Sequence, residues 1–262
     1  MLLLVAHGST TSPVAAETVD RHAAALRRSD LAADVRVAML RGEPALEAVV
    51  AGLPDSAGVV VLPMMMTDGV LSREELPQRL QAALTETDKS IGTPVLLPPL
   101  GTGAAFAQLV LQRAQEAARE RPGGEGGHAL LLIAHGNAAD PQGRRSIERL
   151  AAMVRADGAF ADVAIAFLEE APTIIDALAA IRLPVVAVGL FAAEGRHARL
   201  DVPRLLAQAP DGQSVVWLGA LGADAALPGV LNAHVSASLE SGRTTERSRA
   251  AQSSSASSCA EG

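Results

Sequence analysis

Two histidines stand in nearly identical surroundings, one near the start of each half of the chain. His7 lies in LLLVAHGS (residues 2–9) and His135 in LLLIAHGN (residues 130–137). In both segments an apolar run typical of a buried strand ends in Ala-His-Gly. Imidazole titrates near neutral pH and is a common metal ligand. A single histidine at such a place more often serves only to hydrogen-bond a loop, so it is the repetition that indicates acid–base or metal chemistry.

Two further residues of the second half are candidates to join His135. Glu169 closes the apolar run 163–167, and His197 follows the next apolar run through the loop AAEGRH. The carboxyl ends of parallel strands meet at one edge of a sheet, so we expect the three side chains to converge. Two imidazoles and one carboxylate suit a divalent first-row metal. We expect the neighbouring Glu170 to be a solvated loop carboxylate.

The repetition extends over almost the whole chain and indicates an internal duplication. Four blocks match in the same order, with an offset that falls from 128 to 126 and then 121: 2–13 with 130–141, 35–44 with 163–172, 59–77 with 185–203, and 94–103 with 214–224. By this matching, Arg41 and Leu71 take the places of Glu169 and His197. The second half therefore keeps a complete set of candidate ligands, and the first half keeps only His7.

The elements that position these residues have the pattern of an α/β protein. Continuous apolar runs predict strands covered on both faces, and Ala-rich segments of helical period lie between them. We expect two tandem halves, each a mainly parallel four-stranded sheet flanked by helices, with a cleft between the halves. The predicted strands are 2–6, 35–39, 58–62, 94–98, 129–133, 163–167, 184–188 and 214–218. The predicted helices include 14–28, 72–84, 104–119, 142–155, 200–208 and 225–238.

The expected domain boundaries follow from composition. RPGGEGG (121–127) reads as a linker, since proline and glycine do not continue a helix. It separates an N-terminal half, 1–122, from a C-terminal half, 128–240. Residues 241–262 are rich in Ser, Arg and Ala and poor in apolar side chains, and we expect this tail to be disordered.

The composition excludes several classes of protein. The net charge is −7, and no basic block suits nucleic acid. No apolar run approaches the roughly 18 residues of a membrane span, and Met1 leads directly into apolar sequence without the basic region of a signal peptide. The single cysteine, Cys259, allows neither an internal disulfide nor a cysteine metal cluster. We therefore expect a cytoplasmic protein with no nucleic-acid or membrane partner.

At these residues the sequence resembles the class II tetrapyrrole chelatases, the sirohydrochlorin cobaltochelatases and ferrochelatases. The resemblance covers about residues 1–238 and is carried by LLVAHGS, LLIAHGN, FLEEAP (167–172) and a loop of the form LFxxxGxHxxxDxP (190–203). It implies a long-form enzyme that inserts Co²⁺ or Fe²⁺ into sirohydrochlorin, or a closely related tetrapyrrole, in cobalamin or siroheme biosynthesis. The divalent metal is then a substrate, no cofactor is permanently bound, and one chain supplies both halves, so we expect a monomer.

The resemblance also implies roles for individual residues. His135 and His197 match the family's metal-binding histidines, Glu169 its acidic partner, and His7 its first-half histidine. Insertion requires two pyrrole N–H groups to lose protons, and imidazole accepts protons near neutral pH. Because sirohydrochlorin carries many carboxylates, cations beside the second-half histidines are candidates to orient it. These candidates are Arg144, Arg145, Arg196 and Arg199, although a solvated helix charge is an equally good reading of any one of them.

Two other functions fit parts of the sequence. The loss of ligands at Arg41 and Leu71 is consistent with a non-catalytic carrier of metal or tetrapyrrole derived from a chelatase. A histidine phosphatase also places a histidine after its first strand, but it uses Arg-His-Gly, whereas Ala6 and Ala134 precede the histidines here. No GxSxG, Walker A or GxGxxG motif follows a strand. The ligand set suits cobalt and iron equally.

Overall fold

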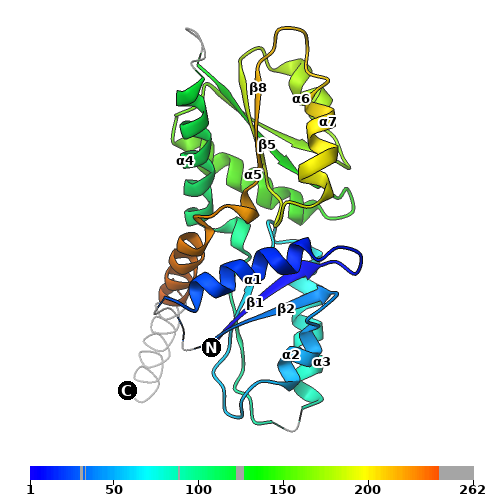
Figure 1. The fold of residues 1–262 in the computed structure, drawn as a ribbon, viewed down its shortest axis with the longest axis vertical. Coiled ribbons are helices and arrows are strands. Elements are labelled where there is room, and N and C mark those ends of the chain that lie inside the picture. The colour runs from blue at the N-terminus through cyan, green and yellow to red at the C-terminus, as the bar shows by residue number, and fades with distance from the viewer. Residues whose placement is uncertain (30–31, 33, 88, 122–126, 242–262) are drawn as a thin grey trace, which may run out of the picture.

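The protein, described here from a computed structural model, contains two separate four-stranded parallel sheets (Figure 1). The structure describes residues 1–29, 32, 34–87, 89–121 and 127–241. Across the first sheet the strands are β2 (Val35–Arg41), β1 (Leu2–Gly8), β3 (Val60–Pro63) and β4 (Val95–Leu96). Across the second they are β6 (Asp162–Phe167), β5 (Ala129–Ala134), β7 (Val185–Gly189) and β8 (Val215–Ala220). Both sheets therefore have the same strand order. In the first sheet, β1 lies beside the edge strand β2, which ends in Arg41; in the second, β5 lies beside the edge strand β6, which leads to Glu169.

Helices cover both faces of each sheet. The first half contains α1 (Val14–Leu26), α2 (Leu46–Ala51), the π-helical turn η1 (Leu71–Glu75), α3 (Leu76–Thr85), the 3₁₀ turn η2 (Leu100–Thr102) and α4 (Ala104–Glu120). The second half contains α5 (Pro141–Ala156), α6 (Ile174–Ala180), the π-helical turn η3 (His197–Asp201), α7 (Val202–Leu206) and the 3₁₀ turn η4 (Leu221–Ala223). A last helix follows over residues 227–241.

The halves exchange their last helices. Helix α4 follows the first sheet in sequence but packs against β7, β8 and α5 of the second half. The helix over 227–241 returns to the first half (Figure 1), where Nε2 of His234 donates a hydrogen bond to the carbonyl of Pro98 at 2.9 Å. This exchange places a continuous apolar core between the two sheets, because α1, α4, α5 and the last helix all contribute to it.

Polar contacts reinforce the exchanged arrangement. His22 of α1 donates through Nε2 to the carbonyl of Gly222 in η4, at 2.9 Å. Arg113 of α4 forms a bidentate ion pair with Asp224, with distances of 2.7 and 2.9 Å. His22 is buried, and burial is the largest influence on its pKa, which lies below the ordinary value. Each half is thus tied to the other through side chains as well as through the core.

The cores explain why the apolar runs are continuous. One face of the first sheet packs against α2 and α3, and one face of the second against α6 and α7, while the opposite faces share the central core. A strand buried on both faces needs apolar residues at every position. The core is built of Leu, Val, Ala, Ile and Met, with Phe106 and Phe167 as its fully buried aromatic residues.

The predicted architecture is confirmed: all eight strands form, and both sheets are parallel. The short helices α2 and α6 lie outside the predicted ranges. Among the described helices, none is long and apolar enough to cross a membrane. The predicted tail begins at Ser241, but that residue is helical, so the expected disorder is wrong there. Residues 242–262 of the tail and residues 122–126 of the predicted linker lie outside the described part of the chain.

Candidate metal and tetrapyrrole site

The second sheet brings the three candidate ligands to one edge. His135 directly follows β5, the strand between β6 and β7. The backbone N–H of Glu169 donates to the carbonyl of His135 at 3.0 Å, which holds the end of β6 beside the end of β5. His197 begins η3, after the loop that leaves β7 on the other side of β5. The central strand end therefore has the carboxylate on one side and the second imidazole on the other.

His135 lies close to both partners. Its Nε2 is 3.5 Å from Oε1 of Glu169, and its ring meets that of His197 edge to face, with centroids 4.9 Å apart. Two donors bound at about 2.1 Å to one tetrahedral ion lie about 3.4 Å apart, so the first separation suits a shared metal. Among the described residues, however, no group of three or more His, Cys, Asp or Glu side chains is already arranged to hold an ion. The structure brings the three residues together as an open, loose set.

Hydrogen bonds determine which nitrogen each imidazole offers. Nδ1 of His135 lies 3.0 Å from the carbonyl of Gly136, and Nδ1 of His197 lies 2.9 Å from a carboxylate oxygen of Asp201. A carbonyl and a carboxylate only accept, so both Nδ1 atoms carry the proton. In the neutral ring the lone pair is then on Nε2, the form in which imidazole binds a metal.

The turn after each first strand requires glycine. Gly8 and Gly136 have φ values of +72° and +81°, which side chains with a Cβ rarely adopt. A Cβ at Gly8 would lie 2.0 Å from the carbonyl oxygen of Arg41, and one at Gly136 would lie 2.9 Å from Cβ of Phe167. The Ala-His-Gly motif thus lets the chain leave the strand while passing tightly over its neighbour.

The first half replaces the ligand set with an ion pair. Arg41, at the end of β2, forms a bidentate pair with Glu75 of η1; the Nη2–Oε2 distance is 3.2 Å. The hydrogen bond from Arg41 is the largest influence on Glu75 and holds the pKa of that carboxyl below its ordinary value. Leu71 begins η1, as His197 begins η3. The first half therefore holds a guanidinium where the second half holds Glu169.

His7 lies at the end of β1, the strand of the first half that corresponds to β5 of the second. Burial is the main cause of its lowered pKa, Arg41 lowers it further, and the charge of His135 adds a smaller effect in the same direction. Glu75 acts in the opposite direction. The neutral form of His7 is therefore favoured.

A carboxylate joins the two halves beside these histidines. Asp140 caps α5, accepting from the backbone N–H of Gly143 at 3.0 Å, and its other oxygen accepts from the N–H of Val70 in the first half, also at 3.0 Å. The N–H of Asp68 donates to the hydroxyl of Ser146 on α5 at 3.1 Å. The loop that leads to Leu71 is thereby anchored to the helix that follows His135.

The predicted substrate-binding arginines fall into two groups. Arg144 is engaged within the protein: it pairs with Glu148 at 3.0 Å and Glu170 at 3.3 Å, and donates to the carbonyl of Ala171. The prediction that Glu170 is solvated is wrong, since its side chain is only 10% exposed and it also accepts from the backbone of Asn137. The side chain of Glu169, by contrast, is 60% exposed, so Glu169 is the carboxylate that faces solvent.

The remaining arginines are exposed and loosely held. Arg145 contacts Gln142 at 3.4 Å, and Arg196, whose side chain is 77% exposed, contacts Asp201 at 3.5 Å. Arg199 is exposed, and its side chain has no hydrogen-bond or ion-pair partner among the residues that the structure describes. These three cations remain available to a ligand, whereas Arg144 supports the turn behind the site.

Sequence reasoning did not assign roles to Asp201 and Glu75, the carboxylates that contact His197 and Arg41. Burial is the largest influence on Asp201 and acts to raise its pKa, but the hydrogen bond from His197 and the charge of Arg196 outweigh it and hold the value below the ordinary range. Both carboxylates stand four residues after the repeat-matched positions 71 and 197. That shared spacing was the available signal.

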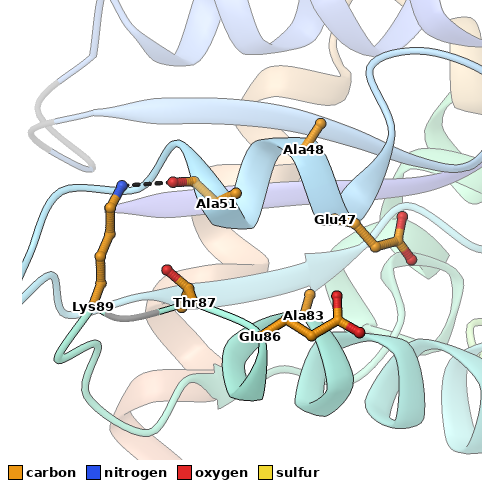
Figure 2. Close-up of a pocket in the computed structure, with 7 residues that line it drawn as sticks. All are labelled: Glu47, Ala48, Ala51, Ala83, Glu86, Thr87 and Lys89. Carbon is orange, nitrogen blue, oxygen red and sulfur yellow. Dashed lines mark hydrogen bonds between the residues drawn. The ribbon is translucent and has the colours of Figure 1, made fainter.

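A hollow on the surface of the first half is separate from the site formed by His135, Glu169 and His197. It lies between α2 and α3 on the first half and is lined by Glu47, Ala48, Ala51, Ala83, Glu86, Thr87 and Lys89 (Figure 2). Lys89 donates to the carbonyls of Ala51 and Leu53 at 2.6 and 2.7 Å, and Glu47 is paired with Arg79. Lys89 and Glu47 are thus bound within the protein, so the hollow is a weaker candidate for the functional site than the strand-end residues.

Comparison with known proteins agrees with this architecture. A probable sirohydrochlorin cobaltochelatase from Halobacterium salinarum is 26% identical over 254 residues, which cover 85% of this chain and 86% of that protein. The solved structure of CbiX, described as the terminal enzyme of siroheme biosynthesis in denitrifying bacteria, is 29% identical, with a TM-score of 0.70 over 90% of this chain and 98% of that one. SirB from Bacillus subtilis subspecies spizizenii in complex with cobalt has the same fold, at 16% identity and a TM-score of 0.69 over 91% of this chain and 94% of that one.

The duplicated parallel sheets, with an imidazole at the end of the first strand of each, form the α/β architecture of the chelatases to which the chain is similar. The CbiX family model matches residues 1–117 and 129–238, so it covers both halves. The chain belongs to the CbiX family.

Proposed function

We propose that this protein inserts a divalent metal ion, Co²⁺ or Fe²⁺, into sirohydrochlorin or a closely related tetrapyrrole. The observation that carries the proposal is the meeting of His135, Glu169 and His197 at one sheet edge. Family membership and the names of the relatives support the reaction class.

The second half would supply the metal. The lone pairs on Nε2 of His135 and His197 and the carboxylate of Glu169 form a mixed N/O set suited to a first-row dication. Because the side chains are loosely arranged and largely exposed, they would bind the ion weakly enough to release it to the macrocycle. The negative charge of Glu169 favours the dication, whereas the guanidinium of Arg41 would repel it at the matching place in the first half.

The macrocycle would lie where the strand ends of the two halves meet, since the first-half loop that leads to Leu71 is hydrogen-bonded to the start of α5, the helix that follows His135. Two pyrrole N–H protons must leave as the metal enters. A neutral imidazole accepts a proton, and burial and Arg41 favour that form of His7. The exposed guanidinium groups of Arg145, Arg196 and Arg199 would bind peripheral carboxylates of the substrate. One chain would contain the whole site, so we propose a monomer with no permanently bound cofactor.

The test is an insertion assay under anaerobic conditions. Purified protein is mixed with sirohydrochlorin and Co²⁺, or with Fe²⁺, and the visible absorbance is followed. We expect a rate above the spontaneous one with at least one metal, and several product molecules per protein. A spontaneous rate with both metals would contradict the proposal.

A second candidate is a carrier, which the Arg41–Glu75 ion pair favours because it removes one of the two matched ligand sets. A carrier would give one spectral change per protein molecule and then stop. Turnover in the same assay distinguishes the two functions.

A further inference from the structure

The contact between His197 and Asp201 is the best-defined hydrogen bond to a candidate ligand. Nδ1 of His197 donates to Oδ2 of Asp201 at 2.9 Å, across the single turn of η3. The carboxylate accepts only, so the proton is fixed on Nδ1 and the lone pair on Nε2. In metal sites, a carboxylate behind a ligating histidine fixes the ring orientation and increases its basicity.

We propose that Asp201 is a positioning residue, which fixes the tautomer and direction of His197 so that Nε2 is presented to the metal substrate. This inference rests on the proposed metal site and adds to it a residue that acts through His197 rather than by touching the ion. Phe191 also lies beside the ring, with its centroid 6.2 Å from that of His197. Phe191 restricts where the imidazole lies, but it cannot select a tautomer.

In the first half, the corresponding carboxylate makes a different contact. Glu75 occupies the matching place on η1, where Leu71 replaces the histidine, and its carboxylate turns instead to Arg41. The carboxylate is therefore present in both turns, but it orients an imidazole only in the half that keeps the full ligand set. A purely structural requirement of the turn would not depend on the residue four positions earlier.

The turn itself has other supports. Nε1 of Trp217 donates to the carbonyl of Ala198 at 3.1 Å, and the N–H of Arg199 donates to the carbonyl of Gly195 at 3.0 Å. Arg196 contacts the other oxygen of Asp201 at 3.5 Å, but its side chain is 77% exposed, so this pair contributes little. Removal of the Asp201 charge should therefore leave the backbone of η3 in place.

The experiment compares Asp201→Asn with Glu75→Gln, a matched control that removes the same charge from the same position of the other turn. Co²⁺ affinity is measured by calorimetry without tetrapyrrole, and long-range ¹H–¹⁵N spectra of the metal-free protein report the tautomer of His197. We expect protonated Nδ1 in the wild type, a mixture of tautomers in Asp201→Asn, and about 10- to 100-fold weaker Co²⁺ binding. Glu75→Gln should change neither quantity, and Asp201→Glu should bind Co²⁺ more tightly than Asp201→Asn.

The outcomes separate this inference from the proposed function. Protonated Nε2 on His197 in the wild-type protein would overturn the positioning role, whether or not any variant folds. If His135→Ala and His197→Ala weaken Co²⁺ binding and a folded Asp201→Asn does not, the metal site stands and the positioning role is wrong. If none of these variants changes the affinity, the metal site is wrong and the positioning role fails with it.

Discussion

Asp140→Ala should weaken the connection between the halves beside the proposed site. The substitution removes two hydrogen bonds of 3.0 Å: the cap on Gly143 at the start of α5, and the acceptor for the N–H of Val70 in the first half. Asp140 lies five residues after His135, and Val70 directly precedes Leu71. One side chain therefore joins the loops that position both halves of the site.

The expected cost follows from these two contacts. Loss of an N-cap costs about 1 kcal/mol. A hydrogen bond to a charged acceptor contributes roughly 1.5–3 kcal/mol, but Val70 is 42% exposed and water can replace part of it. We assign about 1 kcal/mol to this contact, so the free energy of unfolding should fall by about 2 kcal/mol in total.

Urea denaturation followed by the fluorescence of Trp217, the single tryptophan, measures this change. Thr173→Ala is the matched control, because Thr173 caps α6 within the second half alone; it should cost about 1 kcal/mol. Asp140→Asn keeps a good capping residue but loses one acceptor oxygen, so its cost should lie between zero and that of Asp140→Ala. If Asp140→Ala costs no more than Thr173→Ala, the bond to Val70 does not stabilise the arrangement of the halves.

Three further predictions address the first half and its contacts. Leu71→His alone should not create a second Co²⁺ site, because Arg41 remains. Leu71→His combined with Arg41→Glu should raise the calorimetric stoichiometry from one to two Co²⁺ ions per chain, and an unchanged stoichiometry would show that the matched positions are not equivalent. Burial lowers the pKa of His22, so its contribution to the free energy of unfolding should be fully present above about pH 6.5 and be lost as the pH falls through the lower folded-state pKa. His22→Gln should reduce the fall in the urea midpoint at low pH. An equal fall in both proteins would contradict the role of His22 in this pH dependence. Gly8→Ala should lower the melting temperature strongly, because its Cβ would lie 2.0 Å from the carbonyl oxygen of Arg41; a melting temperature like that of the wild type would show that the turn adapts.

The fold was predictable because the apolar runs and the internal repeat both indicate the same arrangement of strands and helices. Strands such as β1 and β5 are apolar at successive positions and buried on both faces, and the matched blocks predicted the same succession of strands along the chain in each half. The exchange of α4 was not predictable. The apolar face of a helix shows that it packs on a sheet, but it does not show which of two similar sheets it covers.

The candidate site was predictable in part. Strand-end positions and repeat matching selected His135, Glu169 and His197, and the structure brings them together. The role of Asp201 depends on which side chain its carboxylate reaches within one helical turn, and the different partner of Glu75 shows that the position alone does not decide it. The sequence does not distinguish Arg144 from the other candidate arginines, because its contacts with Glu170 and Ala171 form only when the turn after β6 folds against α5.

The central claim is that the second half binds the metal substrate, and the most direct test is the rate of Co²⁺ insertion into sirohydrochlorin by histidine variants. His135→Ala and His197→Ala should each lower the rate by at least about tenfold, since loss of even an outer-shell partner of a metal ligand typically costs 10- to 100-fold in metal affinity or activity. His7→Ala should lower turnover less and leave Co²⁺ affinity almost unchanged, because Arg41 and Leu71 give it no ligand partners. Loss of activity in His7→Ala with normal rates in His135→Ala and His197→Ala would contradict the claim.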